Sequence, residues 1–178
     1  MAKLVQKVGI FIDAENIELS GYNIYGGRTD YKKIIKAIGE REITRIIYYK
    51  PQYKEVSDVF KKFWEGEVGG EIKQPLKNAD SLLIMDAVTL ADKLDVVVIL
   101  GGDKDYLPLL WYLKSRGCKT ELWGYPETVS DIMKESVDKF FALDESYIIK
   151  DKPRGKLSYK PRFPEHKHEE GGGDNSSL

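Results

Sequence analysis

The chain has 178 residues, 42% of them hydrophobic, and a formal net charge of −1. A near-neutral chain has no general attraction to nucleic acid or anionic membranes, so such contacts would have to come from local basic clusters. The sequence has no apolar run near the ~18 residues of a membrane span and no signal-peptide core at its start, so we expect a cytoplasmic protein. The single cysteine, Cys118, excludes an intramolecular disulfide, and we expect it to be buried.

Predicted strands and helices alternate along the chain. Runs of apolar or β-branched residues that stop at a glycine, a proline or a carboxylate predict strands at residues 8–13, 44–49, 72–76 (short and weak), 96–100, 118–123 and 140–143. Apolar residues spaced as on one face of a helix predict helices at residues 30–39, 56–64, 81–91, 107–116 and 130–137. After Ala14–Ile17, a loop through three glycines is expected to lead to Asp30, and the helix at 81–91 is expected to be buried on all sides.

This alternation predicts a three-layer α/β fold with a mostly parallel central sheet. We expect one domain over residues 1–149. Residues 150–178 form a basic and then polar tail, which we expect to be disordered. The basic part, Lys152–Arg162, is either an RNA contact or a solubilising linker.

Carboxylates follow the predicted strands where parallel strands meet at one rim. Asp13 ends the first strand, and Asp103 and Asp105 follow the apolar strand at 96–100. Asp80 opens the helix at 81–91. Acids that converge in this way repel one another unless a divalent cation neutralises them, and hard oxygen ligands suit Mg²⁺ or Mn²⁺. Taken singly, Asp80 and Asp105 could equally be helix caps.

Asp86 is a secondary candidate. It lies inside an apolar helix, where an unpaired charge would be costly.

Several segments, in this order, resemble the NYN domain, a family that includes the LabA-like proteins and belongs to the PIN-like nuclease superfamily. They are Phe11–Asn16, Lys77–Asp80 followed by Asp86, Gly101–Tyr106, and Gly117 with Ser130–Phe140. The resemblance implies a Rossmann-like (PIN-like) sheet with a metal-dependent ribonuclease site, in which the principal carboxylates are Asp13, Asp80 and Asp103.

The resemblance also implies secondary roles. Asp105 would be an auxiliary metal ligand, and Asn16 would hold the substrate or a water molecule at the metal. Lys77 and Lys104 would meet the substrate, although Lys77 is equally well explained as a solvated loop lysine. This chain has Gly101 where the family often has Ser and Tyr106 where it often has Phe; neither change removes a ligand.

Lysines and arginines near this rim alternate with tyrosines, a pattern that suits single-stranded RNA because bases stack on rings while cations meet phosphates. The tyrosines are Tyr22, Tyr25, Tyr31, Tyr49 and Tyr53. Each of them is equally explained as part of a strand or helix surface. The exposed edge strand and the aromatic residues around Phe60, Phe63 and Trp64 would also suit a homodimer, but packing in the core explains them equally well.

The leading hypothesis is therefore a Mg²⁺- or Mn²⁺-dependent ribonuclease. The alternative is a non-catalytic RNA- or protein-binding module that retains the acidic pocket. An aspartyl-phosphate phosphatase ranks last, because that chemistry needs a second Asp two residues after Asp13 and the chain has Glu15 there.

Overall fold

The computed structural model describes residues 5–39 and 41–150. Within these residues, six parallel strands form one sheet in the order β4-β3-β1-β5-β6-β7. The strands are β1 (Lys7–Asp13), β3 (Glu42–Tyr49), β4 (Glu71–Lys73), β5 (Val96–Leu100), β6 (Lys119–Gly124) and β7 (Lys139–Ala142). Two short antiparallel strands, β2 (Arg28–Thr29) and β8 (Ile148–Ile149), pair beside the sheet. The predicted fold class is confirmed, and the predicted tail lies outside the described residues.

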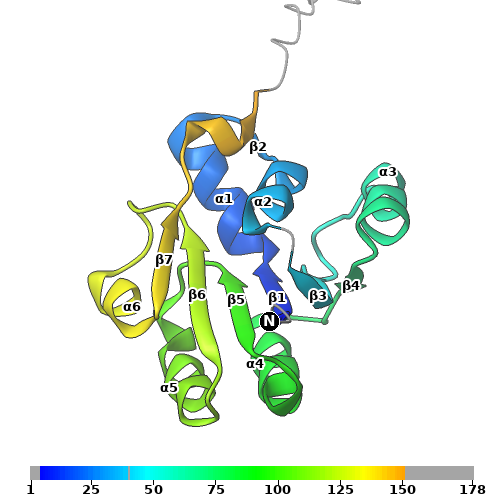
Figure 1. Ribbon diagram of the computed structural model, residues 1–178. Coiled ribbons are helices and arrows are strands. Elements are labelled where there is room, and N and C mark those ends of the chain that lie inside the picture. Colours follow the sequence, from blue (N-terminus) through cyan, green and yellow to red (C-terminus); the bar gives the residue numbers. More distant parts are fainter. Residues whose placement is uncertain (1–4, 40, 151–178) are drawn as a thin grey trace, which may run out of the picture.

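Helices cover both faces of the sheet (Figure 1). They are α1 (Ala14–Tyr25), α2 (Tyr31–Ile38), α3 (Asp58–Lys61), the π-helix η1 (Lys62–Val68), α4 (Asp80–Leu90), the short 3₁₀ turn η2 (Ala91–Lys93), the 3₁₀ turn η3 (Lys104–Tyr106), α5 (Leu107–Ser115), α6 (Asp131–Ser136) and the 3₁₀ turn η4 (Glu145–Tyr147). One core packs α1, α2 and the α3–η1 region against the sheet, and the other packs α4, α5 and α6 against the opposite face. The fold therefore has three layers.

The central strands explain why the sheet could be predicted well. Every residue of β5 is buried, because β5 lies between β1 and β6 and has helices on both faces. A strand of this kind appears in the sequence as a continuous apolar run rather than as an alternating one. The pairing of β1 with β5 brings Ile12 opposite Leu100, so Asp13 and the loop after β5 lie at the same rim.

The predicted loop after residue 17 is wrong, because α1 continues to Tyr25. The buried face of α1 carries Ala14, Ile17, Ser20 and Gly21, and these mostly small residues give little hydrophobic periodicity. Gly21 is required within the helix, because a Cβ there would lie 2.7 Å from the hydroxyl oxygen of Tyr125.

Two other helices differ from their predictions. The helix α4 is not buried on all sides: Leu83 and Ala87 are buried, but Met85 is 64% exposed. The helix predicted at 56–64 is instead the short α3 followed by η1, and it ends at Gly69 in the left-handed conformation. Within residues 5–39 and 41–150, no helix is long and apolar enough to cross a membrane.

Candidate active site

Three of the predicted acids gather at the carboxyl ends of β1 and β5. Asp13 is the last residue of β1 and is 5% exposed. Asp80 is the first residue of α4, and Asp103 follows β5 in the loop that leads to η3. Asp80 does not cap its helix, since the N-cap position is Ala79; the simple capping explanation of Asp80 is therefore wrong.

Tyr106 joins two of these acids. Its hydroxyl oxygen lies 2.8 Å from Oδ2 of Asp13 and 2.9 Å from Oδ1 of Asp80, and the residue is fully buried. A phenol carries one proton, so it can donate to only one carboxylate at a time. The two acids thus share one hydroxyl group, which can donate a hydrogen bond to only one of the two carboxylates.

The pKa of Asp13 reflects its surroundings. Burial above all, together with the negative charges of Asp80 and Asp103, raises the pKa of the Asp13 carboxyl to about 6. Hydrogen bonds donated by the Asn16 backbone N–H, at 3.1 Å, and by the Tyr106 hydroxyl act in the opposite direction. The three acids therefore affect one another electrostatically, as expected when like charges share a site.

The loop after β5 has a defined geometry. Asp103 caps η3, because its Oδ1 accepts a hydrogen bond of 2.9 Å from the Asp105 backbone N–H. The capping role expected for Asp105 thus belongs to Asp103. Asp105 itself is exposed, and its auxiliary metal role stays a prediction.

Asn16 and Gly101 bring α1 and this loop together. Oδ1 of Asn16 accepts a hydrogen bond of 2.8 Å from the Gly102 backbone N–H. A Cβ at position 101 would lie only 3.3 Å from Cβ of Asp13 and 3.5 Å from Cε2 of Tyr106. The glycine therefore makes room for the close approach of Asp13 and Tyr106. Among residues 5–39 and 41–150, no group accepts a hydrogen bond from Nδ2 of Asn16, and its contact with the substrate stays a prediction.

The predicted lysines lie at the edge of the site. Lys77 precedes Asp80 in an exposed loop, and Lys104 follows Asp103 and is also exposed. Within the described part of the chain, neither lysine forms an ion pair with Asp13, Asp80 or Asp103. Both are placed where they could meet a substrate phosphate.

Asp86 lies in a separate, neutralised environment. Its Oδ2 accepts hydrogen bonds of 2.7 Å from the Tyr49 hydroxyl and of 2.7 Å from Nζ of Lys73. This pairing accounts for a charged residue on an otherwise apolar helix.

A carboxylate that was not predicted lies further along α1. Glu18 accepts hydrogen bonds from the hydroxyls of Tyr48 and Tyr31 and a 2.7 Å bond from Nζ of Lys50. One turn earlier, Glu15 lies 3.1 Å from the Tyr53 hydroxyl. A helical assignment for residues 14–25 would have placed Glu15 and Glu18 on one face.

The tyrosines predicted to stack on RNA differ in exposure. Tyr31 and Tyr49 are buried in the core and Tyr25 is partly buried, whereas Tyr22 and Tyr53 are 62% and 63% exposed. The two exposed tyrosines are the best placed to accept a base from solvent.

The donor set can be tested for its fit to a divalent cation. No three Asp, Glu, His or Cys side chains among residues 5–39 and 41–150 are grouped closely enough to hold one ion between them. Mg²⁺, however, is usually bound through one or two carboxylates, with water and substrate phosphates completing its shell. Asp13 and Asp80, joined at one phenol and with Asp103 nearby, fit such a site.

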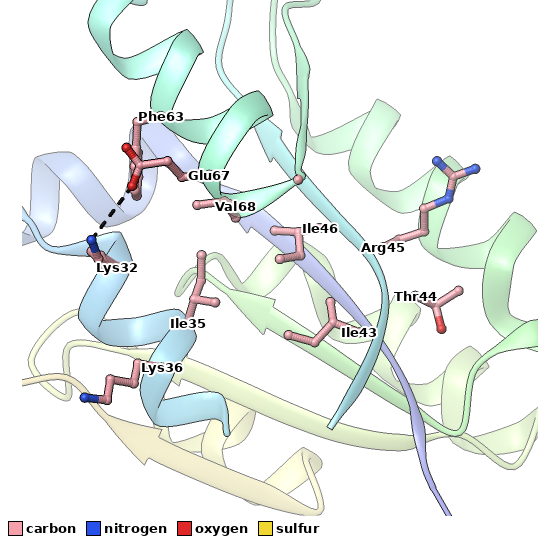
Figure 2. A pocket seen from close by; sticks show the side chains of 11 residues that line it. Lys32, Ile35, Lys36, Ile43, Thr44, Arg45, Ile46, Phe63, Glu67 and Val68 are labelled. Carbon is pink, nitrogen blue, oxygen red and sulfur yellow. Dashed lines mark ion pairs between the residues drawn. The ribbon is translucent and has the colours of Figure 1, made fainter. Parts of the chain in front are cut away.

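Several cavities lie among the described residues. One, of about 710 Å³, is lined by Glu18, Tyr22, Tyr48, Lys50 and Phe60 among others; we call it the Glu18 cavity. Another, of about 350 Å³, lies between α2, the first half of β3 and η1. Figure 2 shows its apolar lining, which includes Ile35, Ile43, Ile46 and Val68. Neither cavity is lined by the three acids.

A parallel Rossmann-like sheet with an acidic rim defines a class of α/β proteins that bind ligands beyond the carboxyl ends of their strands. The model of the NYN domain matches residues 7–144, and the chain belongs to this family of PIN-like proteins. The family is typically one of ribonucleases that act on RNA and generally use divalent metals. The predicted family is confirmed.

Solved structures show the same fold. A crystal structure of a protein of unknown function from Vibrio parahaemolyticus superposes with a TM-score of 0.74 at 21% identity, covering 84% of this chain and 99% of that one. No curated protein matches the chain.

Proposed function

We propose that the protein is a divalent-metal-dependent ribonuclease that hydrolyses phosphodiester bonds of single-stranded RNA. The observation that carries the proposal is the meeting of Asp13 and Asp80 at the Tyr106 hydroxyl, with Asp103 close enough to raise the pKa of Asp13. Ion pairs of these three acids are absent among the described residues. Their charge favours a bound cation, and the family generally uses divalent metals.

The residues of the chain have separate roles in this proposal. Asp13 and Asp80 would hold Mg²⁺ or Mn²⁺, and Asp103 would complete the site once the cation is bound, with Asp105 as an outer carboxylate. When bound, the cation supplies Lewis-acid stabilisation of the phosphodiester charge and activates the attacking water. Tyr106 positions Asp13 and Asp80 relative to each other.

Further residues would position the substrate. Asn16 orients the loop that carries Asp103 and keeps Nδ2 for the substrate. Lys77 and Lys104 would contact phosphates on either side of the acids, because their charges are not used by the three carboxylates.

The test is cleavage of a labelled single-stranded RNA with Mg²⁺ or Mn²⁺. Asp103→Asn should lower the rate by at least ~100-fold, because even residues that only support a metal ligand contribute about 10–100-fold. Asp131→Asn is the matched control, since its side chain is 91% exposed on α6, and it should cleave at the wild-type rate.

Two results would overturn the proposal. If Asp103→Asn cleaves as fast as the wild type, the activity comes from another site or a contaminant. If the wild type binds RNA but never cleaves it with any divalent metal, the protein is the non-catalytic binding module that the sequence also allowed.

A further inference from the structure

The Glu18 cavity lies near the rim that carries the acids. Tyr48 and Lys50 line it, and they flank Tyr49, which pairs with Asp13 across the neighbouring strands. Asp13 also caps α1, and Glu15, Glu18 and Tyr22 lie together on one face of this helix because they are spaced three and four residues apart. At 1.5 Å per residue, Tyr22 lies about 13 Å along the helix from Asp13. A strand that passes the acids is therefore close enough to reach this cavity.

The floor of the cavity is a packed aromatic group. The rings of Tyr48 and Phe60 lie 4.8 Å apart, and those of Tyr31 and Tyr48 lie 5.5 Å apart. Tyr31 and Tyr48 are buried, and both hydroxyls donate to Glu18. The Glu18 carboxylate is thus held in place before any ligand arrives, as binding sites require.

The hydrogen bonds of Glu18 leave room for one further donor. Each carboxylate oxygen can accept about two hydrogen bonds. Oε1 already accepts from Tyr31 and Tyr48, whereas Oε2 accepts from Lys50. One free acceptor suits a single hydroxyl group better than the paired N–H groups along the edge of a guanine base.

The walls supply the other contacts that a nucleotide needs. Tyr22 is 62% exposed and lines the cavity, so its ring is available for a base to stack on. Lys50 uses one of its three N–H donors on Glu18, which leaves two for a phosphate. A volume of about 710 Å³ lies within the usual range of small-molecule sites, roughly 300–1,000 Å³.

We infer that the Glu18 cavity binds one nucleotide of the RNA strand next to the cleaved bond, and that Glu18 accepts a hydrogen bond from its ribose 2′-hydroxyl. The inference rests on the proposed function only in taking the ligand to be RNA. The 2′-hydroxyl is the group by which a protein distinguishes RNA from DNA at a given position. The cavity would therefore select RNA, while the acids carry out the hydrolysis.

The experiment measures binding without cleavage. Fluorescence anisotropy in EDTA compares a labelled eight-residue RNA with the 2′-deoxy strand of the same sequence. The wild type should bind the RNA about tenfold more tightly, since a hydrogen bond to a charged group is worth about that factor. Glu18→Gln should remove most of this preference, while its matched control Glu135→Gln, on exposed α6, should keep it.

A second variant tests the stacking contact. Tyr22→Ala should weaken RNA and the deoxy strand by the same factor of about ten, because base stacking does not depend on the sugar. Tyr112→Ala is the matched control: Tyr112 is also partly exposed, at 39%, but lies on α5, and its loss should leave both affinities unchanged.

The inference is overturned if Glu18→Gln keeps the full preference for RNA, or if Tyr22→Ala binds like the wild type. Failure of the proposed ribonuclease activity would look different. In that case no metal would support cleavage, yet the preference for RNA would still depend on Glu18. Conversely, cleavage that requires Asp103 together with a preference that ignores Glu18 would remove this inference alone.

Discussion

Asp13 caps the N-terminus of α1, and Glu18 lies five residues further along the same helix. The negative charges of these two carboxylates are compensated very differently. Glu18 receives two phenol hydroxyls and the ammonium group of Lys50 at 2.7 Å. Asp13 shares one phenol with Asp80 and has Asp103 nearby. Tyrosine hydroxyls donate to both carboxylates, but only Glu18 also pairs with a lysine.

The difference separates a structural carboxylate from one kept for an external cation. The charge of Glu18 is compensated within the protein, so its remaining acceptor position is held in place for a ligand. The acids around Tyr106 repel one another, and this repulsion costs stability until something positive binds. Asp86, which pairs with Lys73 and Tyr49, resembles Glu18 in this respect and not Asp13.

The largest effect is expected from Asp13→Asn in the metal-free protein. The pKa of Asp13 is about 6 in the folded chain and 3.8 in a model peptide, so the folded state binds more protons between these values. Wild-type stability therefore falls as pH rises from about 4 to above 6, by up to about 3 kcal/mol. Asparagine is never charged, so Asp13→Asn should be more stable by that amount at pH 8 and equal near pH 4.

Urea unfolding in EDTA at pH 4, 6 and 8 measures this difference. Asparagine is as good an N-cap as aspartate, and its Nδ2 can donate to the Tyr106 oxygen, so the substitution leaves no polar group unpaired. A variant that is less stable than the wild type at pH 8 would show that Asp13 is not under electrostatic strain.

Lys50→Met tests the Glu18 group. This substitution should lower the free energy of unfolding, whereas Asp13→Asn should raise it at pH 8. The side chains of Lys50 and Glu18 are 16% and 32% exposed, and removing one partner of a fully buried pair costs about 3–5 kcal/mol. We expect a loss of about 2 kcal/mol for this partly exposed pair. Lys54→Met is the control, because Lys54 pairs with Glu15 at 3.7 Å in a more exposed setting, where pairs are worth about 0–1 kcal/mol.

Equal losses for Lys50→Met and Lys54→Met in the same urea experiment would mean that the Glu18 group is not specially stabilised. The contrast with Asp13 would then disappear.

The sheet and its acidic rim could be predicted because their causes are local. The buried strand at 96–100 is a continuous apolar run, and Asp13 and Asp103 directly follow strands that pair side by side. Only the parallel topology was needed to bring them to one edge.

The rest of the site depends on contacts between distant residues. Tyr106 reaches Asp13 across 93 positions and Asp80 across 26, and nothing in the neighbouring sequence indicates that a buried phenol would lie between them. Glu18 was missed because small residues on the buried face of α1 hid its helical period. The one available signal for the bridging hydroxyl was Tyr106 itself, because the NYN family often has phenylalanine at this position.

The smallest effect on stability is expected from Tyr106→Phe, which removes that hydroxyl and little else. The loss of one buried hydrogen bond costs about 1 kcal/mol. Without the bridge, Asp13 and Asp80 are no longer held together, and affinity for Mn²⁺ should fall by about 10-fold, as for other residues that orient metal ligands. Isothermal titration with Mn²⁺ measures the affinity.

Tyr49→Phe is the matched control, because it removes a buried tyrosine hydroxyl that donates to Asp86 at 2.7 Å. It should cost similar stability but leave Mn²⁺ affinity unchanged. If both variants bind Mn²⁺ like the wild type, Tyr106 fills space at the rim but does not position its acids.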